Sequence, residues 1–152
     1  MNDDLIGYDA TELAKLIRDG QVKPTELLEI TIQRIERLNP KLNAVIHKMY
    51  DQARGIAGDC DSRSHRTASP EAVFYGVPFL LKDLLAEYKG APFHEGSRAI
   101  AGYVSKLDTE LVKRQKAAGL IIFAKTNAPE FGLLPTTEPE LYGPTLNPWN
   151  PI

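Results

Sequence analysis

The sequence predicts an α/β fold in which helices come first and the strands of a mixed or parallel sheet follow. Two apolar runs without strict alternation, 74–85 and 120–124, are typical of strands covered on both faces. Between them lies a helix candidate over 108–118, with Asp108 as its cap and Gly119 at its end. Strand, helix and strand in this order favour a parallel crossover unit, and therefore a layered architecture.

Length and composition indicate one ordinary globular domain. The chain has 152 residues, of which 43% are hydrophobic and 25% charged, and this excludes the composition of disordered proteins. Because the net charge is −2 and Lys and Arg are scattered, we expect no nucleic-acid partner. The acidic start, the lack of a long apolar run and the single Cys60 favour a cytoplasmic protein without membrane contact.

Two amphipathic helices are predicted at the start of the chain. Asp9 and Glu12 have the spacing of an N-terminal capping pair, and apolar residues then repeat at helical intervals until Gly20. Pro24 fits the first turn of a second helix, because proline is tolerated there. The apolar face of this helix continues until the Asn39–Pro40 pair, which is expected to end it.

The remaining segments receive simpler assignments. Residues 43–46 are expected to be extended, and 50–58 are expected to form a third helix. Small, polar and charged residues dominate 59–70, which predicts a surface loop. Prolines recur after Glu130 with little apolar periodicity, so the end of the chain is expected to be irregular coil.

Lys82 is the clearest candidate for a residue with a chemical role. It ends the apolar run 76–84, where burial is expected. A lysine acts as a general base only when neutral, and its ordinary pKa of about 10.4 must be lowered for that, by up to ~3–5 units through desolvation. The carboxyl end of a central strand lies at a ligand crevice and offers such a site. The alternative is an ammonium that reaches water beside an exposed Asp83.

Thr126 and Asn127 follow the second apolar run. Their side chains either face the same crevice as Lys82, or Asn127 caps the next helix at Pro129, and the sequence favours neither. Ser97 has no base at a fixed spacing, so a turn or cap role is expected for it rather than a nucleophilic one.

The three histidines give no indication of a metal site. His47, His65 and His94 lie in unrelated segments without ligand spacing, so no metal is expected. Aromatic side chains in the last part of the chain, Tyr142 and Trp149 among them, are expected to anchor that segment onto a larger body.

The order and spacing of several motifs resemble the amidase signature family. The family carries its lysine in a motif that matches Gly76-Val77-Pro78 followed by Lys82-Asp83. Further matches follow in the family's order: Gly90, Gly96-Ser97-Arg98, the helix at Asp108, Ala117-Ala118-Gly119, Lys125-Thr126-Asn127, Glu130-Phe131, Gly143-Pro144-Thr145 and Asn147-Pro148-Trp149. No single motif is decisive, but their order and spacing together are specific.

This resemblance implies an α/β/α layered fold and hydrolysis of a carboxamide C–N bond by a Ser-Ser-Lys triad. Lys82 would accept a proton from a bridging serine, which in turn deprotonates the attacking serine. Asp83, Thr126 and Asn127 would bind substrate or support the site. No cofactor is implied, the expected partner is a small-molecule amide, and a homodimer of the full-length protein is left open.

The family's two serines lie in a Gly/Ser-rich segment shortly after an Asn-Pro-Trp motif. Because the sequence given ends at Ile152, residues 1–152 are expected to be an incomplete amidase domain that is inactive alone. We divide it into N-terminal helices and a loop over 1–72, the start of the α/β core with the lysine over 73–132, and an irregular Pro-rich segment over 133–152.

Departures from the family pattern bear on substrate. Phe93-His94-Glu95 stands where the family commonly has small hydroxyl residues, which predicts a reshaped acyl pocket. The run 136–140 resembles the branch that includes hydrolases of the 6-aminohexanoate cyclic dimer. Ala128-Pro129 stands where the glutaminyl-tRNA-forming amidotransferase subunit has Met-Asp, so the chain looks unlike that subunit and a small-amide hydrolase is favoured. The amidotransferase subunit is kept as the alternative within the family. A non-catalytic remnant or partner-binding fragment is the alternative outside it.

Overall fold

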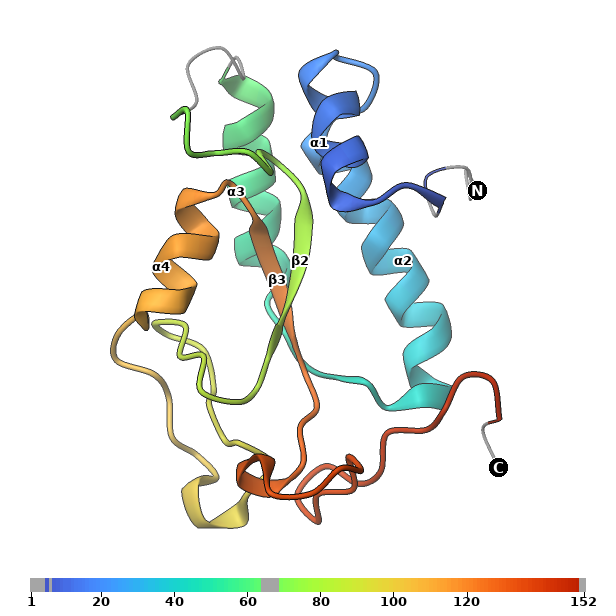
Figure 1. Cartoon of the computed structure of the whole chain (residues 1–152), viewed down its shortest axis with the longest axis vertical. Helices are drawn as coiled ribbons and strands as arrows, with labels where there is room; N and C mark the ends of the chain where they lie inside the picture. Colours follow the sequence, from blue (N-terminus) through green and yellow to red (C-terminus); the bar gives the residue numbers. More distant parts are fainter. Residues whose placement is uncertain (1–4, 6, 64–68, 151–152) are drawn as a thin grey trace. The chain divides into compact units, whose positions relative to one another are not determined.

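The computed structural model describes residues 5, 7–63 and 69–150 (Figure 1). The chain divides into two compact units: unit 1 contains Met1–Arg34, Met49–Phe79 and Arg114–Phe123, and unit 2 contains Ile35–Lys48, Leu80–Lys113 and Ala124–Ile152. The elements in chain order are α1 (Ala10–Arg18), α2 (Pro24–Leu42), β1 (Val45–Lys48), α3 (Tyr50–Ser62), β2 (Pro78–Lys82), η3 (Arg98–Ile100), α4 (Glu110–Ala117), β3 (Ile121–Thr126) and η4 (Glu130–Gly132), where η denotes a 3-10 helix. This content confirms the predicted α/β class.

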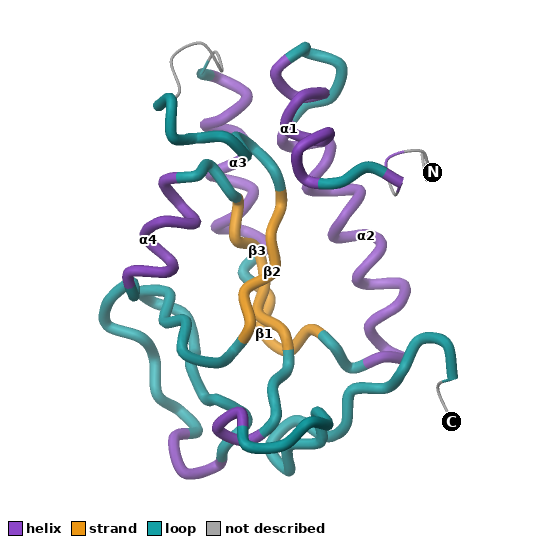
Figure 2. The backbone as a smooth tube through the Cα atoms, viewed as in Figure 1, coloured by secondary structure: helices purple, strands orange, loops and turns teal. Residues whose placement is uncertain are grey.

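The three strands form a mixed sheet in the order β1-β3-β2, drawn in orange in Figure 2. β1 pairs antiparallel to β3. Two backbone hydrogen bonds give the direction of β2 relative to β3. Ile121 N donates to Val77 O at 2.8 Å near the start of both strands, and Asp83 N donates to Thr126 O at 3.1 Å near their ends. The two strands are therefore parallel, and β2, α4 and β3 form the predicted crossover unit.

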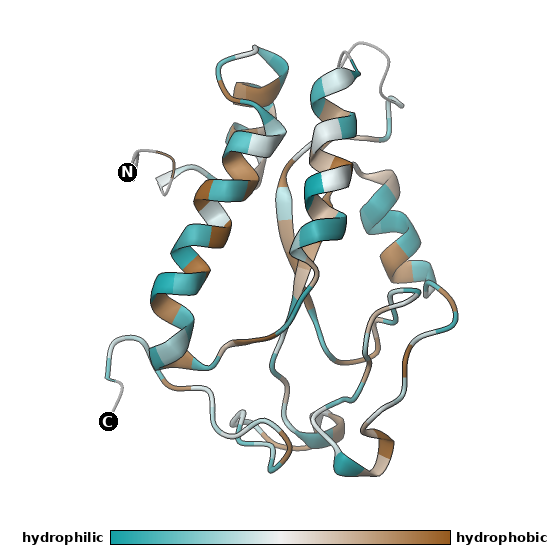
Figure 3. Cartoon of the chain, turned by 180° about the vertical axis from the view of Figure 1, so that it is seen from behind, coloured by the Kyte–Doolittle hydropathy of each residue, from teal (hydrophilic) through white to brown (hydrophobic). Residues whose placement is uncertain are grey.

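The first two helices agree with the sequence except at one end. Asp9 caps α1 and forms a capping box with Glu12, as predicted. Brown and teal bands alternate along α2 in Figure 3, which shows its amphipathic character. The prediction that α2 ends at the Asn39–Pro40 pair is wrong, because α2 continues to Leu42 and Asn43 N donates to Asn39 O at 2.8 Å. Pro40 lies in the last turn of α2, so the hydrogen bond that it lacks and the clash of its ring with the preceding turn affect only the end of the helix.

The predicted loop over 59–70 also begins too early. α3 extends to Ser62, and Arg63 N still donates to Asp59 O at 3.1 Å. Asp61 accepts a hydrogen bond of 2.5 Å from Thr25 Oγ1, a contact that holds this last turn. Residues 64–68 of the predicted loop lie outside the described residues.

The two strands predicted to be covered on both faces differ in burial. β3 is buried at five of its six positions, as expected for a strand covered on both faces. β2 is shorter than the predicted run and is buried only at Leu81, so the same expectation is wrong for β2. Backbone at positive φ flanks it, at Gly76 (80°) and Leu85 (57°), and this ends the extended conformation on both sides.

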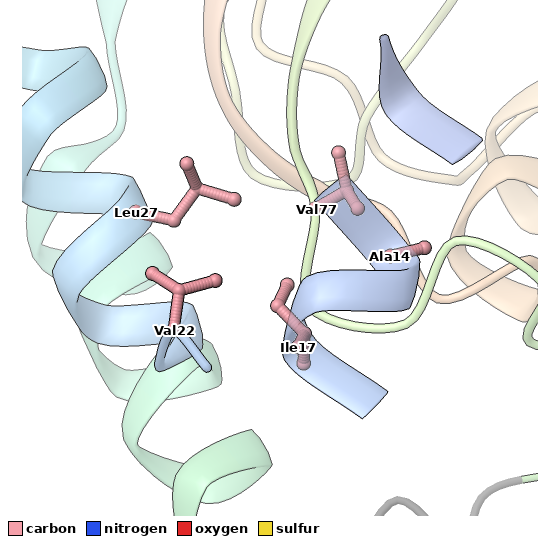
Figure 4. Close-up of a cluster of buried hydrophobic side chains, with 5 residues drawn as sticks. All are labelled: Ala14, Ile17, Val22, Leu27 and Val77. Carbon is pink, nitrogen blue, oxygen red and sulfur yellow. The ribbon is translucent and has the colours of Figure 1, made fainter. Parts of the chain in front are cut away.

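A hydrophobic cluster in unit 1 joins α1, the start of α2 and the residue before β2. Its buried members are Ala14, Ile17, Val22, Leu27 and Val77, whose side chains lie together in Figure 4. Burial of a Leu, Ile or Val side chain contributes roughly 1.5–3 kcal/mol each. Gly76 lies beside this cluster, and a Cβ there would come within 2.6 Å of Pro24 Cγ. Chain packing as well as backbone conformation therefore requires glycine at this position.

Most of unit 2 outside the strands is irregular, as Figure 2 shows for the teal segments that follow β2 and β3. Up to residue 150, where the described part of the chain ends, the predicted coil after Glu130 is confirmed apart from the 3-10 turn η4 and an isolated bridge between Asn147 and Asn150. Hydrogen bonds between distant segments order this part of the chain; for example, Thr145 N donates to Thr137 O and Leu146 N donates to Leu42 O, at 2.8 and 2.9 Å.

Candidate active site

Lys82 is the last residue of β2, and its side chain is exposed. The neighbours on either side, Leu81 and Asp83, are buried. Successive side chains of a strand point to opposite faces, so Lys82 faces away from the side on which Leu81 and Asp83 are covered. The expectation that this lysine is buried is therefore wrong for the chain as described.

The buried lysine of unit 2 is Lys125, in β3. Its side chain and that of Asp83 are both 0% exposed, and the two form an ion pair. Lys125 Nζ also donates to Pro92 O at 2.8 Å and lies 4.8 Å from the centre of the Phe93 ring. Burial lowers the pKa of Lys125, while the hydrogen bond and charge of Asp83 act in the opposite direction.

Sequence reasoning did not assign this ion pair. Lys125 entered only as part of a matching motif, although it directly follows the apolar run 120–124. A lysine that continues a buried strand must be paired, because an isolated charge cannot be desolvated at reasonable cost. The position of Lys125 directly after an apolar run was therefore the sequence signal for a buried, paired lysine. That Asp83 is its partner depends on the parallel pairing of β2 with β3.

Asp83 connects several parts of unit 2. Its Oδ2 accepts a hydrogen bond from His94 N at 3.2 Å, and its own N–H donates to Thr126 O at 3.1 Å. The residue directly after Lys82 is thus fixed through both its backbone and its carboxylate. The alternative interpretation of Lys82 placed an exposed Asp83 beside it, and this part of the alternative is wrong because Asp83 is buried.

Thr126 and Asn127 lie at the end of β3, but they have different environments. Thr126 is half-buried, whereas Asn127 is only 7% exposed. The Asn127 Nδ2 group donates to Gly143 O and Thr145 Oγ1, both at 3.0 Å. The capping alternative for Asn127 is wrong, because η4 has Pro129 at its N-cap without a side-chain hydrogen bond, and Asn127 is used to hold 143–145.

The Phe93-His94-Glu95 segment has structural contacts for each residue. Phe93 lies against Lys125 and His94 contacts Asp83, as described above. Glu95 Oε1 accepts a hydrogen bond from Leu85 N at 2.9 Å, and both residues have positive φ, 57° for Leu85 and 48° for Glu95. Non-glycine residues in this conformation are strained and cluster at functional sites, so this turn after β2 is held under strain.

His47 and His94, which no local pattern connects, are neighbours in unit 2. Their ring centroids are 5.2 Å apart, and Tyr142 Oη lies between them, within hydrogen-bonding distance of His94 Nδ1 and 2.9 Å from His47 Nε2. His65 lies outside the described residues. No sequence signal joins these residues, because the two contacts of Tyr142 span 48 and 95 positions.

Ser97 has the predicted capping role. Its Oγ accepts a hydrogen bond from Ala99 N at 3.2 Å at the start of η3 and donates to Glu130 Oε1 at 2.6 Å. Within the described residues, no group of three His, Cys, Asp or Glu side chains is arranged to hold a metal ion. Among the helices of that same part of the chain, none combines the length and the apolar character that a membrane crossing requires.

The chain matches a family model and known proteins along most of its length. The Amidase family model matches residues 26–152. A 6-aminohexanoate-cyclic-dimer hydrolase from Paenarthrobacter ureafaciens is 41% identical over 144 residues, covering 93% of this chain and 27% of that protein. A glutamyl-tRNA(Gln) amidotransferase subunit from Salinispora tropica is 35% identical over 147 residues, covering 97% of this chain and 30% of that protein.

Solved structures agree with the fold. A structure of 6-aminohexanoate cyclic dimer hydrolase superimposes with a TM-score of 0.81 at 41% identity, covering 94% of this chain and 28% of that one. The sequence given therefore spans less than a third of the length of these relatives. The motif order read from the sequence, the mixed sheet with its crossover and these matches agree: the chain belongs to the amidase family.

Proposed function

We propose that the protein containing this chain hydrolyses a carboxamide C–N bond through a Ser-Ser-Lys triad in which Lys82 is the final proton acceptor. The observation that carries the proposal is the position of Lys82 at the end of β2, where its side chain is exposed. The backbone of the next residue, Asp83, is fixed by its hydrogen bond to Thr126 O. The exposure of Lys82 leaves its amine accessible to other groups, and the Asp83–Lys125 ion pair holds the strand end.

Proton transfer begins at the lysine. A neutral Lys82 Nζ takes a proton from a bridging serine, and this serine takes the proton of the attacking serine. The attacking oxygen then bonds to the amide carbon, the C–N bond breaks, and the amine leaves with a proton, which gives an acyl-enzyme that water hydrolyses. Backbone N–H groups stabilise the oxyanion. The two serines and these donors would come from a Gly/Ser-rich segment outside the 152 residues.

A lysine that accepts a proton must be neutral, and desolvation is the general way to favour the neutral amine. We infer that further parts of the protein cover Lys82, so that the 152 residues alone are inactive. Asp83, Thr126 and Asn127 are proposed as residues that support the site or contact substrate, since all three lie at the adjoining ends of β2 and β3.

We propose a small-molecule amide as the substrate. We also propose that the enzyme is cytoplasmic. The relative named as a cyclic-dimer hydrolase supports the choice of substrate through its 41% identity. A role in an amidotransferase is the second candidate, supported by a relative of that name at 35% identity. A non-catalytic remnant that binds a partner is the third candidate, and it applies only if no serine-bearing segment follows.

The first test is to sequence the coding region through and beyond the codon for Ile152 and to assay the whole protein. We expect a Gly/Ser-rich segment to follow, and we expect Lys82→Ala to abolish hydrolysis of a small amide while Lys89→Ala, another exposed lysine of unit 2, does not. Release of ammonia from glutamine in place of small-amide hydrolysis supports the amidotransferase role. Undiminished amide hydrolysis by Lys82→Ala overturns the proposal.

A further inference from the structure

Two histidines and a tyrosine outside the proposed triad form a hydrogen-bonded cluster in unit 2, which we call the His47–Tyr142–His94 relay. The His94 and Tyr142 rings are stacked with centroids 6.0 Å apart, and His47 meets the two rings edge-on at 5.2 and 5.5 Å. All three side chains are half-buried. The relay joins β1, the segment after β2 and the last segment of the chain.

The protons of the relay can be assigned from its contacts. Gly102 N–H donates to His94 Nε2 at 3.1 Å, so this nitrogen carries a lone pair and His94 is neutral, with its proton on Nδ1. That Nδ1–H donates to Tyr142 Oη. The Tyr142 hydroxyl then donates to His47 Nε2 at 2.9 Å, the remaining acceptor within its reach among the described residues. His47, when neutral, therefore also carries its proton on Nδ1.

The relay attaches the segment 139–146 to the surroundings of Lys82. The backbone oxygen of Tyr142 accepts a hydrogen bond of 2.7 Å from Asn43 Nδ2, which fixes the same residue from the other side. His94 N donates to Oδ2 of Asp83, which is the residue directly after Lys82 in the chain. His47 is the pairing partner of Lys125 in the sheet, so the relay and the buried ion pair are neighbours.

A second proton on His47 conflicts with this arrangement. Its Nε2–H and the His94 Nδ1–H would then point at one oxygen, and the Tyr142 hydroxyl proton would lose its acceptor. The charged and titratable groups that act on His47 are Asp83, which attracts the new charge, and Lys125 and His94, which oppose it; burial is the largest cause that lowers the pKa of His47. Burial and the charge of Asp83 raise the pKa of Tyr142 to about 12, so its hydroxyl stays protonated at neutral pH.

We propose that the His47–Tyr142–His94 relay is a pH-sensitive latch. With both histidines neutral it ties the Tyr142 side chain beside Asp83, and protonation of His47 breaks this tie and loosens 139–146, which Asn43 and Asn127 still hold at Tyr142 O, Gly143 O and Thr145 Oγ1. Any effect of the latch on catalysis at Lys82 rests on the proposed function, whereas the latch itself does not. Tautomers and amide exchange are measured without turnover, so failure of the latch and failure of the amidase proposal are distinguishable.

The first measurement is a long-range proton–nitrogen NMR spectrum of the whole protein with nitrogen-15 histidine, at about pH 7.5. We expect both His47 and His94 as neutral rings protonated at Nδ1, the less common tautomer of free histidine. A ring protonated at Nε2 in either residue overturns the assignment. The second measurement is hydrogen exchange of the Leu146 amide, which donates to Leu42 O at 2.9 Å and reports attachment of the segment.

Protection of Leu146 is expected to fall about tenfold or more between about pH 7.5 and about pH 5, after correction for intrinsic exchange. In His47→Gln the glutamine oxygen still accepts from Tyr142 but cannot titrate, so protection should stay high at both pH values. Equal loss of protection in wild type and His47→Gln, or no loss in wild type, overturns the latch.

Tyr142→Phe provides the second variant, because it keeps the ring and removes the hydroxyl. We expect reduced Leu146 protection at both pH values and an altered tautomer balance of His94. Tyr103→Phe is the matched control, since the Tyr103 hydroxyl contacts Glu87 at 3.0 Å and not the relay, and it should leave Leu146 unchanged. If Tyr142→Phe does not fold, the comparison of wild type with His47→Gln decides alone.

Discussion

Lys125 and Asp83 form an ion pair in which neither side chain is exposed. Asp83 directly follows Lys82 in the chain. The pair joins the ends of two neighbouring parallel strands, and the hydrogen bonds from Lys125 to Pro92 O and from His94 N to Asp83 satisfy further polar atoms. Breaking such a pair leaves an uncompensated buried charge, whereas replacing both partners with apolar residues can be neutral. The role of the pair is therefore tested by comparing single and double variants.

Lys125→Met is expected to lower the free energy of unfolding by about 3–5 kcal/mol, because Asp83 would remain buried without its cation. The double variant Lys125→Met/Asp83→Leu should recover most of this loss. Urea unfolding of the whole protein measures both. Lys113→Met is the control, since Lys113 pairs with Glu110 at 4.0 Å in an exposed position and its loss should cost less than about 1 kcal/mol. A cost for Lys125→Met as small as that of the control contradicts the prediction.

Lys82→Met should leave the free energy of unfolding within about 0.5 kcal/mol of wild type, because its side chain is exposed. The same variant should lose amide hydrolysis if Lys82 is the proposed base. Thermal unfolding and a turnover assay on one preparation separate the two effects. A stability loss comparable to that of Lys125→Met shows that Lys82 supports the fold instead.

Gly76→Ala should destabilise the protein by about 1–3 kcal/mol, since its φ of 80° disfavours any side chain and the new Cβ would meet Pro24 Cγ at 2.6 Å. Gly55→Ala is the matched variant in α3, where nothing lies within 4 Å of the new Cβ. It should stabilise by about 0.5–1 kcal/mol, because alanine is the better helix former. Denaturant unfolding of both variants should give opposite signs, and a common sign refutes the backbone argument.

The free energy of unfolding should fall as the pH drops below the ordinary pKa of His47, about 6.5. The folded state holds this group neutral, so below that pH the unfolded chain binds the extra proton first and folding becomes less favourable. Above 6.5 neither state is protonated there and the contribution is constant. Unfolding curves of wild type and His47→Gln across this range measure the difference. Parallel pH dependence of the two proteins rules out His47 as its source.

Local sequence was sufficient for much of the fold. The Asp9 and Glu12 spacing predicted the capped start of α1, and the crossover from β2 to β3 followed from the order of apolar and amphipathic runs. Element ends were less well predicted, because the continuation of α2 through Pro40 and of α3 to Ser62 depends on contacts such as that of Asp61 with Thr25.

The sequence by itself determined the α/β class, the capped first helix, the irregular last segment and the family motif that contains Lys82. These features depend on residue types and spacings along a few turns or one strand, where neighbours in sequence are neighbours in space. Tertiary structure decided that Lys125 rather than Lys82 is buried and that Tyr142 joins His47 to His94. Those outcomes depend on which distant segments pack together, and the partners lie 48 and 95 positions from Tyr142, beyond the reach of any local pattern.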